Sequence, residues 1–355
     1  MEAIINGKMD QNKWDNFVQN HKFGDFLQSW EWGEVSKARG NEIHRIAIFD
    51  DDKIIACASI EKYDLPFGIS YLYVARGPVL AWDEIACGSE LSKPKEAFIL
   101  LLDEIEKIAQ KENALFLRID PPIEQGWENI GNMKFWQEIG FIKANKEIQP
   151  KMVVMLNLDK NEDDLLAQMK SKTRYNTRLC LKKGIKIEES TDLADIDGFY
   201  ELMQKTGHRG GFSLHPKKNY QEIIEILAPL NMAKIFLAKY KGKLIAANIV
   251  SFFGNFATYM HGASDDSFRN LMPTYGLQWK SICEAKKMGC KTYDFGGVVS
   301  ENLAKHSWAG ISRFKRGFGA TEKEFIGSLD LPYQKTKYKM FAISNSVRRK
   351  IKGYD

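Results

Sequence analysis

The sequence lacks the patterns that would give its few cysteines a structural role. Its 355 residues include five cysteines, and none belongs to a C-x-x-C pair. An odd, unpaired set argues against a disulfide framework and a zinc knuckle, and it favours reduced thiols. The first residues, Met1–Lys8, contain no basic stretch followed by an apolar one, so we expect no signal peptide. No uncharged apolar run approaches the ~20 residues that span a bilayer, and we expect a soluble cytoplasmic protein.

Motifs for metals and common cofactors are also missing. The six histidines show no H-E-x-x-H pattern or other ligand spacing, so we expect no metal site. There is no Walker loop, no G-x-S-x-G elbow and no G-x-G-x-x-G after a predicted strand. The glycines of Arg316–Gly319 fit either a pyrophosphate cradle or a plain turn. We therefore expect no nucleotide cofactor on a Rossmann domain.

What the chain does contain is typical of a globular protein with about two domains. Hydrophobic residues make up 44% and aromatic residues 12%, which is enough for one or two cores. Fifty-one Lys and Arg face 46 Asp and Glu, a net charge of +5. That excess is too small to indicate a nucleic-acid-binding protein by itself, so the local distribution of charge matters more.

Two successive sets of elements follow the same order along the chain. In the first half we predict strands at 43–49, 53–61, 71–74 and 115–119, with a helix at 95–111. In the second half we predict strands at 232–240, 243–253, 256–261 and 292–294, with a helix at 274–288. Residues 52–60 (DKIIACASI) also match residues 242–250 (GKLIAANIV). An internal duplication of a mixed α/β (α+β) domain is the prediction.

Basic residues gather in two places. Residues 162–183 predict one helix that begins with acids and ends with bases, as the helix dipole favours. Its bases surround Tyr175, and they fit either a solvated face or a docking surface for a polyanion: Lys170, Lys172, Arg174, Arg178, Lys182 and Lys183. The second basic stretch runs from Lys335 to Lys352.

Polar side chains cluster near the ends of predicted strands and helices. Arg118 and Asp120 lie two residues apart on one strand face, as an ion pair or as part of a site. The glycine-rich stretch 207–215 predicts a loop, either a ligand loop or a connector, with His208, Arg209 and His215. Residues 312–316 place four polar side chains around one Phe, as a helix end or as an oxyanion site.

Eight short segments then occur in order from residue 26 to about residue 316: Phe26–Gly33, Tyr71–Val79, Leu117–Pro121, Lys172–Asn176, His261–Ser264, Arg269–Tyr275, Tyr293–Gly297 and Arg313–Lys315. With these segments the chain resembles the FemABX peptidyltransferases over nearly its whole length. The resemblance implies two tandem GNAT-like domains, each a mixed central sheet flanked by helices. Domain 1 would comprise 1–152 plus 325–355 and bind the precursor. Domain 2 would comprise 153–324 and bind aminoacyl-tRNA.

The reaction that the resemblance implies moves an amino acid from aminoacyl-tRNA to the peptide stem of a peptidoglycan precursor, UDP-MurNAc-pentapeptide or lipid II. Because the tRNA ester is already activated, the transfer needs no ATP, metal or CoA. The acetyltransferase signature is missing at both Asp120 and Asp294, so we expect no CoA and no other cofactor. Only about 25 residues separate Gly207 from Met232, so the chain is similar to the compact members without a coiled-coil arm.

The resemblance also implies roles for individual residues. Lys315, beside Phe314, would stabilise the oxyanion and bind the tRNA end, and Asp120 would orient or deprotonate the attacking amine. Further candidates for substrate binding are Lys37, Arg76, Arg118, Arg209, His215, Tyr220, Tyr259 and His261. Candidates for tRNA binding are Lys172, Arg174, Arg178 and Arg316.

The chain departs from the family where some members bind the diphosphate. Ser36 and His215 stand in place of a Lys and an Arg, and Lys37 or Arg209 are the expected substitutes. The acceptor could therefore be a protein N-terminus or a small amine, and a non-catalytic binder of tRNA or precursor is a third reading. We expect a monomer that binds no DNA, with at most peripheral contact between its basic C-terminal segment and the inner leaflet. The amino acid transferred stays open.

Overall fold

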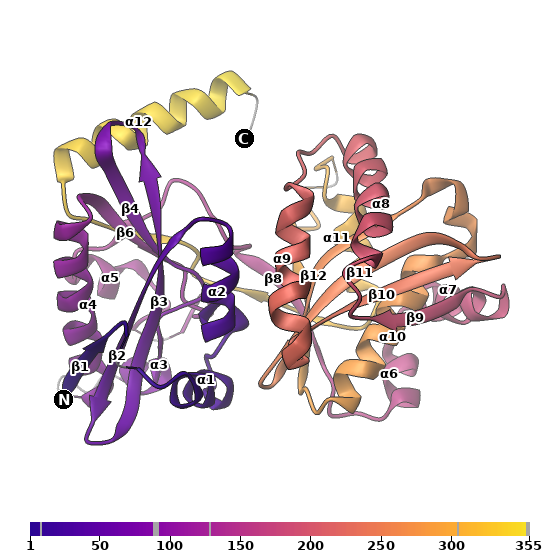
Figure 1. Cartoon of the computed structure of the whole chain (residues 1–355), viewed down its shortest axis with the longest axis horizontal. Coiled ribbons are helices and arrows are strands. Elements are labelled where there is room, and N and C mark those ends of the chain that lie inside the picture. Colours follow the sequence, from indigo (N-terminus) through magenta and orange to yellow (C-terminus); the bar gives the residue numbers. More distant parts are fainter. Residues whose placement is uncertain (8, 88–91, 128, 304, 353–355) are drawn as a thin grey trace. The chain divides into compact units, whose positions relative to one another are not determined.

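The computed structural model describes residues 1–7, 9–87, 92–127, 129–303 and 305–352, with the backbone alone for residues 345–352 (Figure 1). The chain divides into two compact units. Unit 1 comprises Met1–Lys151 and Glu324–Asp355, and unit 2 comprises Met152–Lys323. Among the described helices, none combines the length and the apolar composition that a membrane-spanning segment needs.

Unit 1 is built on a mixed sheet in the order β1-β2-β3-β4-β6-β15-β7, with β5 paired to β3. Neighbouring strands are antiparallel except for the parallel pair β4–β6. The strands are β1 (Glu2–Ile5), β2 (Glu42–Asp50), β3 (Lys53–Leu65), β4 (Ile69–Val74), β5 (Val79–Leu80), β6 (Ala114–Ile119), β7 (Ile142–Lys143) and β15 (Leu329–Pro332). The helices are α1 (Gln11–Asn20), η1 (Phe26–Gln28), α2 (Trp30–Ala38), η2 (Pro66–Gly68), α3 (Trp82–Ala86), α4 (Lys93–Lys111), α5 (Met133–Glu138) and α12 (Lys335–Lys352).

Unit 2 repeats this plan with the strand order β14-β8-β13-β12-β11-β10-β9 and one parallel pair, β12–β13. Its strands are β8 (Met152–Asn157), β9 (Lys186–Ser190), β10 (Ala233–Tyr240), β11 (Lys243–Phe253), β12 (Phe256–Ser264), β13 (Thr292–Gly297) and β14 (Thr321–Glu324). Its helices are α6 (Glu162–Gln168), α7 (Ser171–Lys182), α8 (Asp195–Gly210), α9 (Lys217–Leu227), η3 (Ala228–Leu230), η4 (Asp266–Leu271), α10 (Pro273–Lys287) and α11 (Ala309–Arg316).

The two units confirm the duplication that the sequence predicts. The hairpin β2–β3 corresponds to β10–β11, and the matching nine-residue segments lie in β3 and β11. The strand that completes each sheet beside the parallel pair has a different origin. In unit 2 it is β8, from the start of that unit, whereas in unit 1 it is β15, from the end of the chain. The C-terminal segment is therefore an integral part of the unit 1 sheet.

Apolar spacing explains why the helices cover the sheets as they do. Helix α4 buries Ala97, Leu101, Ile105 and Ile108 at helical spacing, against strand residues such as Leu72. Burial of such side chains is the dominant favourable term in folding, at about 25 cal/mol per Å² of apolar surface. In unit 2, α10 packs on the face of β11 that presents Val250.

One predicted helix is in fact two. We expected a continuous helix over 162–183, but α6 ends at Gln168 and α7 begins at Ser171. Met169 between them is extended, and its side chain is buried in the core of unit 2. The Lys170 N–H then donates to the Gly317 carbonyl at 2.9 Å. Burial of Met169 thus redirects the chain, which a charge pattern alone does not reveal.

Two glycine-rich segments have local explanations. The predicted loop at 207–215 is helical up to Gly210, and Gly211 ends α8 in the left-handed region. A Cβ atom at Gly317 would lie 2.2 Å from Thr173 Oγ1, and one at Gly319 would lie 2.6 Å from the Gln168 carbonyl oxygen. These glycines allow close packing against the α6–α7 junction, which favours the plain turn over a pyrophosphate cradle.

Candidate functional site

Lys315 lies where the parallel strands of unit 2 separate. Strands β12 and β13 pair as far as Thr258 and Asp294 and then part. Lys315, on α11, donates from Nζ to the Gly297 carbonyl at 2.8 Å, and Nζ lies 5.8 Å from the centre of the Tyr259 ring. Only 8% of Lys315 is exposed. Burial lowers the pKa of its ammonium from 10.5 to about 8, with Asp294 acting in the opposite direction.

A β-bulge sends two neighbouring candidates to opposite faces of the unit 2 sheet. Tyr259 pairs with Val250 and His261 with Ile249, so Met260 is an extra residue in β12. Tyr259 therefore faces α10, where it interacts with Gln278, and burial raises its pKa to about 12. Phe314 packs in the same cluster, against Tyr275 and Phe318. The bulge brings Tyr259 and Phe314, but not His261, to the side of Lys315.

His261 belongs to a separate aromatic group on the α8–α9 face. Its ring lies 4.9 Å from the ring of Tyr220 on α9, and the His215 ring lies 6.5 Å from both. Tyr220 is buried and His215 is exposed. Arg209 donates to the Ser264 carbonyl at 3.2 Å and lies 3.9 Å from Asp266. The structure thus gathers His215, Tyr220 and His261, and ties Arg209 to the end of β12.

Gly262 is the residue that makes room for Tyr259 beside Lys315. A Cβ atom at this position would lie 1.9 Å from the Tyr259 hydroxyl oxygen. We expect Gly262→Ala to destabilise unit 2 by about 1–3 kcal/mol, the usual cost of overpacking, and to displace the Tyr259 ring. Urea unfolding measures the loss. Gly310→Ala in α11 meets nothing within 4 Å and is the matched control. Equal stability of the Gly262 and Gly310 variants would contradict this packing.

In unit 1, Asp120 occupies the equivalent strand end and is held by three donors. Its carboxylate accepts from the Tyr73 hydroxyl at 2.6 Å and from the N–H groups of Arg76 and Gln149 at 2.5 and 3.3 Å. Burial raises its pKa to about 6, and the charge of Arg76 acts in the opposite direction. About four lone-pair directions are available to a carboxylate, so roughly one is left for a further donor.

The expected pairing of Arg118 with Asp120 is wrong. Arg118 instead forms a bidentate ion pair with Asp330 on β15, with distances of 2.6 and 2.7 Å. Asp330 is fully buried and also accepts from the Tyr338 hydroxyl of α12 at 2.8 Å. Because Asp330 lies 212 residues away, no local pattern could have revealed it. Arg118 thus joins β6 to the C-terminal segment, and we leave it out of the proposed substrate site.

Arg76 is likewise engaged within unit 1. Its guanidinium donates to the Pro150 carbonyl at 2.8 Å and lies 4.7 Å from the centre of the Phe325 ring. Its backbone is in the left-handed region, with φ 49°, and its N–H reaches Asp120. Arg76 therefore fixes Asp120 through its backbone and the C-terminal segment through its side chain.

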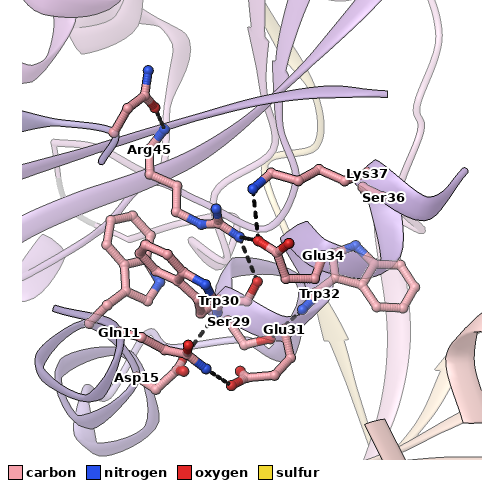
Figure 2. Close-up of polar contacts among 12 residues, drawn as sticks. Gln11, Asp15, Ser29, Trp30, Glu31, Trp32, Glu34, Ser36, Lys37 and Arg45 are labelled. Atoms are coloured by element: carbon pink, nitrogen blue, oxygen red, sulfur yellow. Dashed lines mark hydrogen bonds and ion pairs between the residues drawn. The ribbon is translucent and has the colours of Figure 1, made fainter. Parts of the chain in front are cut away.

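The motif at Phe26–Gly33 holds unit 1 together around Arg45 (Figure 2). The Arg45 guanidinium lies 3.9 Å from the centre of the Trp30 ring and donates to the Trp30 carbonyl at 2.6 Å. A Cβ atom at Gly33 would lie 2.3 Å from Arg45 Nη2, so only glycine fits there. Gln28 links β3 to the chain after β4 through Ser59 and Ala75. This motif therefore has a structural explanation.

Neither residue near the expected diphosphate position is a free cation. Ser36 is buried, and its hydroxyl donates to Glu61, which also accepts from the Tyr63 hydroxyl. Lys37 points at Glu34, with 2.9 Å between Nζ and Oε1, as Figure 2 shows. Glu61 went unnoticed in the sequence because it is a single acid in an ordinary strand pattern. Its carboxylate replaces positive charge with negative charge at this place.

The bases of α7 form an exposed surface in unit 2. A shallow groove of about 340 Å³ is lined by Ser171, Arg174, Tyr175, Arg178, Leu179 and Lys182. Tyr175 is 63% exposed, and α7 contains no acidic residue. Lys172, Arg178 and Lys182 form no ion pair with any residue that the structure describes. We call Lys172, Arg174, Tyr175, Arg178 and Lys182 the α7 surface.

Two of the candidate tRNA-binding residues have internal partners. Arg174 donates to the Ala167 and Met169 carbonyls at 2.7 and 3.2 Å, at the end of α6. Arg316 is 8% exposed and binds Glu322 through two nitrogens, at 2.5 and 3.1 Å. We leave Arg316 out of the proposed tRNA site and regard Arg174 as partly committed to its helix junction.

One group of side chains has metal-ligand types, namely Glu42, His44 and Glu112. The Lys62 ammonium lies 3.1 Å from Glu42 and 2.9 Å from Glu112. A protein cation therefore already balances the two carboxylates, and the cluster is explained as an ion-pair network.

The two repeated mixed sheets define a tandem GNAT-like fold. A tandem GNAT protein from the clavulanic acid biosynthesis pathway has a similar fold, with a TM-score of 0.54 and 10% identity over 93% of this chain and 98% of its own. L-PGS from Bacillus licheniformis gives a TM-score of 0.56 at 10% identity, over 95% and 96% of the two chains. At these identities the likeness concerns fold alone.

The chain belongs to the FemAB family, whose model matches residues 9–244 and 228–346. A crystal structure of FemX gives a TM-score of 0.86 at 25% identity, over 96% of this chain and all of that chain. The lipid II:glycine glycyltransferase of Staphylococcus aureus strain USA300 is 27% identical over 399 aligned positions, covering 92% of each chain. The resemblance drawn from the sequence motifs is confirmed. Because the alignment exceeds 355 positions, that relative contains insertions that this chain lacks.

Proposed function

We propose that this protein is an aminoacyltransferase that forms a bridge or branch on peptidoglycan precursors. It would move an amino acid from aminoacyl-tRNA onto an amine of the peptide stem. The observation that carries the proposal is the buried Lys315 ammonium at the opening between β12 and β13. Relatives described as lipid II:glycine glycyltransferases support the same reaction class.

The reaction follows from the chemistry of the two substrates. The acceptor amine attacks the ester carbonyl carbon, a C–N bond forms, and the carbonyl oxygen becomes an oxyanion. Lys315, held by the Gly297 carbonyl, supplies positive charge to that oxygen from a fixed, poorly solvated position. The C–O bond to tRNA then breaks, the tRNA hydroxyl takes up a proton, and the amine loses one. An ester is thereby exchanged for an amide without any external energy source.

Asp120 is the proposed proton acceptor or orienting group on the acceptor side. With a pKa of about 6 it is mostly ionised at neutral pH, yet it is a stronger base than an exposed aspartate. Its three donors fix the carboxylate in one orientation. The remaining lone pair is then available to an ammonium or amine of the stem peptide.

The α7 surface is the proposed contact for the tRNA backbone. Unpaired bases attract phosphates, and an exposed tyrosine offers a face on which a nucleotide base stacks. Because Lys172 and Arg178 have no internal ion-pair partner among the described residues, changing them should not disturb the fold.

We expect Lys172→Glu with Arg178→Glu to raise the KM for charged tRNA by about tenfold and to flatten its dependence on salt. The physical reason is the loss of counterion release at two phosphate contacts. Steady-state transfer kinetics at several salt concentrations measure both effects. Lys186→Glu with Lys291→Glu is the matched control, since both lysines are exposed in unit 2 outside α7. An unchanged KM would make the α7 surface a solvated helix face.

Glu61 bears on the acceptor. A carboxylate held by Ser36 and Tyr63 repels a diphosphate at that position. We therefore propose that the acceptor is recognised here through its peptide stem, and that a diphosphate, if present, binds elsewhere. This favours an enzyme whose acceptor differs in contacts from that of members with a lysine at this place. An acceptor on a protein N-terminus or a small amine is the second candidate that the same observation permits.

The deciding experiment supplies purified protein with a mixed pool of charged tRNA carrying radiolabelled amino acids. UDP-MurNAc-pentapeptide, lipid II and a free stem peptide serve as parallel acceptors. Label on the free peptide and on at least one precursor would support the proposal, and runs with single tRNAs would then identify the amino acid. Absence of label on all three would reject the cell-wall function, and protein and small-amine acceptors would decide on the second candidate.

A further inference from the structure

The outer face of the C-terminal helix α12 combines exposed apolar and basic side chains. Met340 is 67% exposed and Ile343 is 65% exposed, three residues apart on the helix. These are among the most exposed large apolar side chains of the described residues. Lys337 and Lys339 are also exposed. We call Lys337, Lys339, Met340 and Ile343 the outer face of α12.

The opposite face of α12 is firmly attached to unit 1. The Tyr338 ring packs edge-on against Phe116 at 5.2 Å, and its hydroxyl donates to Asp330 at 2.8 Å. Phe341 lies 5.4 Å from Phe116 and continues this contact. The helix is therefore a folded part of the unit, and its outer face has a defined orientation. Figure 1 shows α12 lying along one side of unit 1.

Helical geometry places the lysines on both sides of the apolar pair. At 100° per residue, Met340 and Ile343 lie on the side of the helix opposite Tyr338. Lys337 and Lys339 fall on either flank of that apolar strip. A central apolar strip with lysines on both flanks is the pattern of a helix that lies in a bilayer interface.

The charge of the helix identifies the kind of surface that it fits. The sequence from Lys335 to Lys352 contains no acidic residue. The basic residues after 344, which the sequence analysis included in the basic C-terminal stretch, lie outside the described side chains, so the argument rests on residues 337–343. Lysines around an apolar strip are complementary to anionic headgroups above acyl chains, whereas a protein partner would need an acidic rim.

We propose that the outer face of α12 docks this protein on an anionic lipid bilayer. Met340 and Ile343 enter the boundary between headgroups and acyl chains, while Lys337 and Lys339 meet the lipid phosphates. Two apolar side chains give weak, reversible binding, which suits an enzyme that returns to tRNA between turnovers. The inference rests on the proposed function only for its purpose, because a lipid-linked acceptor would be met at that surface.

Vesicle flotation tests the docking without tRNA or acceptor, so its outcome is independent of the proposed reaction. We expect the full chain to float with vesicles of phosphatidylcholine and phosphatidylglycerol, and to float poorly with phosphatidylcholine alone. Met340→Ser with Ile343→Ser should lower the binding about tenfold. Lys337→Glu with Lys339→Glu should lower it similarly and remove its dependence on salt.

Two controls keep the test decisive. Leu193→Ser with Leu230→Ser removes exposed apolar side chains from unit 2, at 40% and 52% exposure, and should leave flotation unchanged. Circular dichroism and thermal unfolding should show the α12 variants folded, since the replaced side chains are exposed. Equal flotation of the α12 variants and the wild type, or no preference for anionic vesicles, would overturn the proposal. Failure of the transfer assay with normal flotation would reject the reaction alone.

Discussion

Replacing Lys315 with methionine should abolish transfer and make the folded protein more stable near neutral pH. The loss of positive charge at the oxyanion is expected to lower kcat by about 10²–10³-fold, the usual effect of removing one such group. Methionine has a similar length and fills the same space beside Tyr259. The rise in stability follows because Lys315 is held at a cost in the folded protein.

The size and pH dependence of that cost follow from the pKa of Lys315. Burial lowers it from 10.5 to about 8, and each pKa unit corresponds to about 1.4 kcal/mol. The ammonium is therefore destabilising by up to about 3 kcal/mol below pH 8. Loss of its hydrogen bond to the Gly297 carbonyl offsets about 1 kcal/mol, so Lys315→Met should gain about 2 kcal/mol at pH 7.

The sign of the pH effect separates a functional role from a structural one. Between pH 8 and 10.5 the folded protein loses the Lys315 proton while the unfolded chain keeps it, so the wild type gains stability as pH rises. The advantage of the Met variant should shrink over the same range. Urea unfolding at several pH values measures this difference, and kcat of the wild type should fall above pH 8, as the ammonium deprotonates.

The control is Lys286→Met, because Lys286 also donates to a backbone carbonyl, that of Leu158 at 2.9 Å. This lysine is on α10, and its replacement should leave kcat unchanged. Transfer by Lys315→Met at the wild-type rate would exclude the proposed role of Lys315. A Met variant that is inactive and also strongly destabilised would indicate that Lys315 is mainly structural.

Replacing Arg118 with leucine should cause the largest loss of stability in unit 1. Asp330 is fully buried, and Arg118 is its only cationic partner among the described residues. Removing one partner of such a pair costs about 3–5 kcal/mol, because the other charge is left buried and uncompensated. The ion pair connects β6 to β15, so the C-terminal segment should also lose its attachment.

The double variant Arg118→Leu with Asp330→Leu distinguishes the pair from its parts. Replacing both charges with apolar side chains is often close to neutral, so we expect it to recover most of the loss. Urea unfolding of the single and double variants measures the coupling, and limited proteolysis follows the release of α12. Lys93→Met, which removes an exposed ion pair with Asp50, should leave the unfolding midpoint unchanged. A single variant as stable as this control would contradict the assignment.

Local patterns in the sequence account for much of the fold. The β3 and β11 segments alternate and match each other, and the apolar spacing of α4 marks its buried face, because period and burial are coupled along a single element. Periodicity is less informative where one buried side chain decides the path. Met169 ends α6 by entering the core, although charges on both sides of it continue a helical pattern.

The candidate site shows the same division between local and distant information. Motif resemblance indicated Lys315, Asp120 and the α7 bases, since these residues stand in short recognisable segments. The partners of Arg118 and Arg316 could not be read in this way, because Asp330 and Glu322 reach them through the fold. The Phe26–Gly33 motif was visible, but its reason, space for Arg45, was not.

The sequence by itself determined the duplication, the two sheets, the family and the chemical types at the site. Only the tertiary structure decided which of those groups meet. The extra residue Met260 in β12 places Tyr259 beside Lys315 and sends His261 to Tyr220 on the other face. Strand β15 enters the unit 1 sheet from the end of the chain and pairs Asp330 with Arg118. Long-range pairing depends on the summed packing of the whole unit, which no short segment of sequence contains.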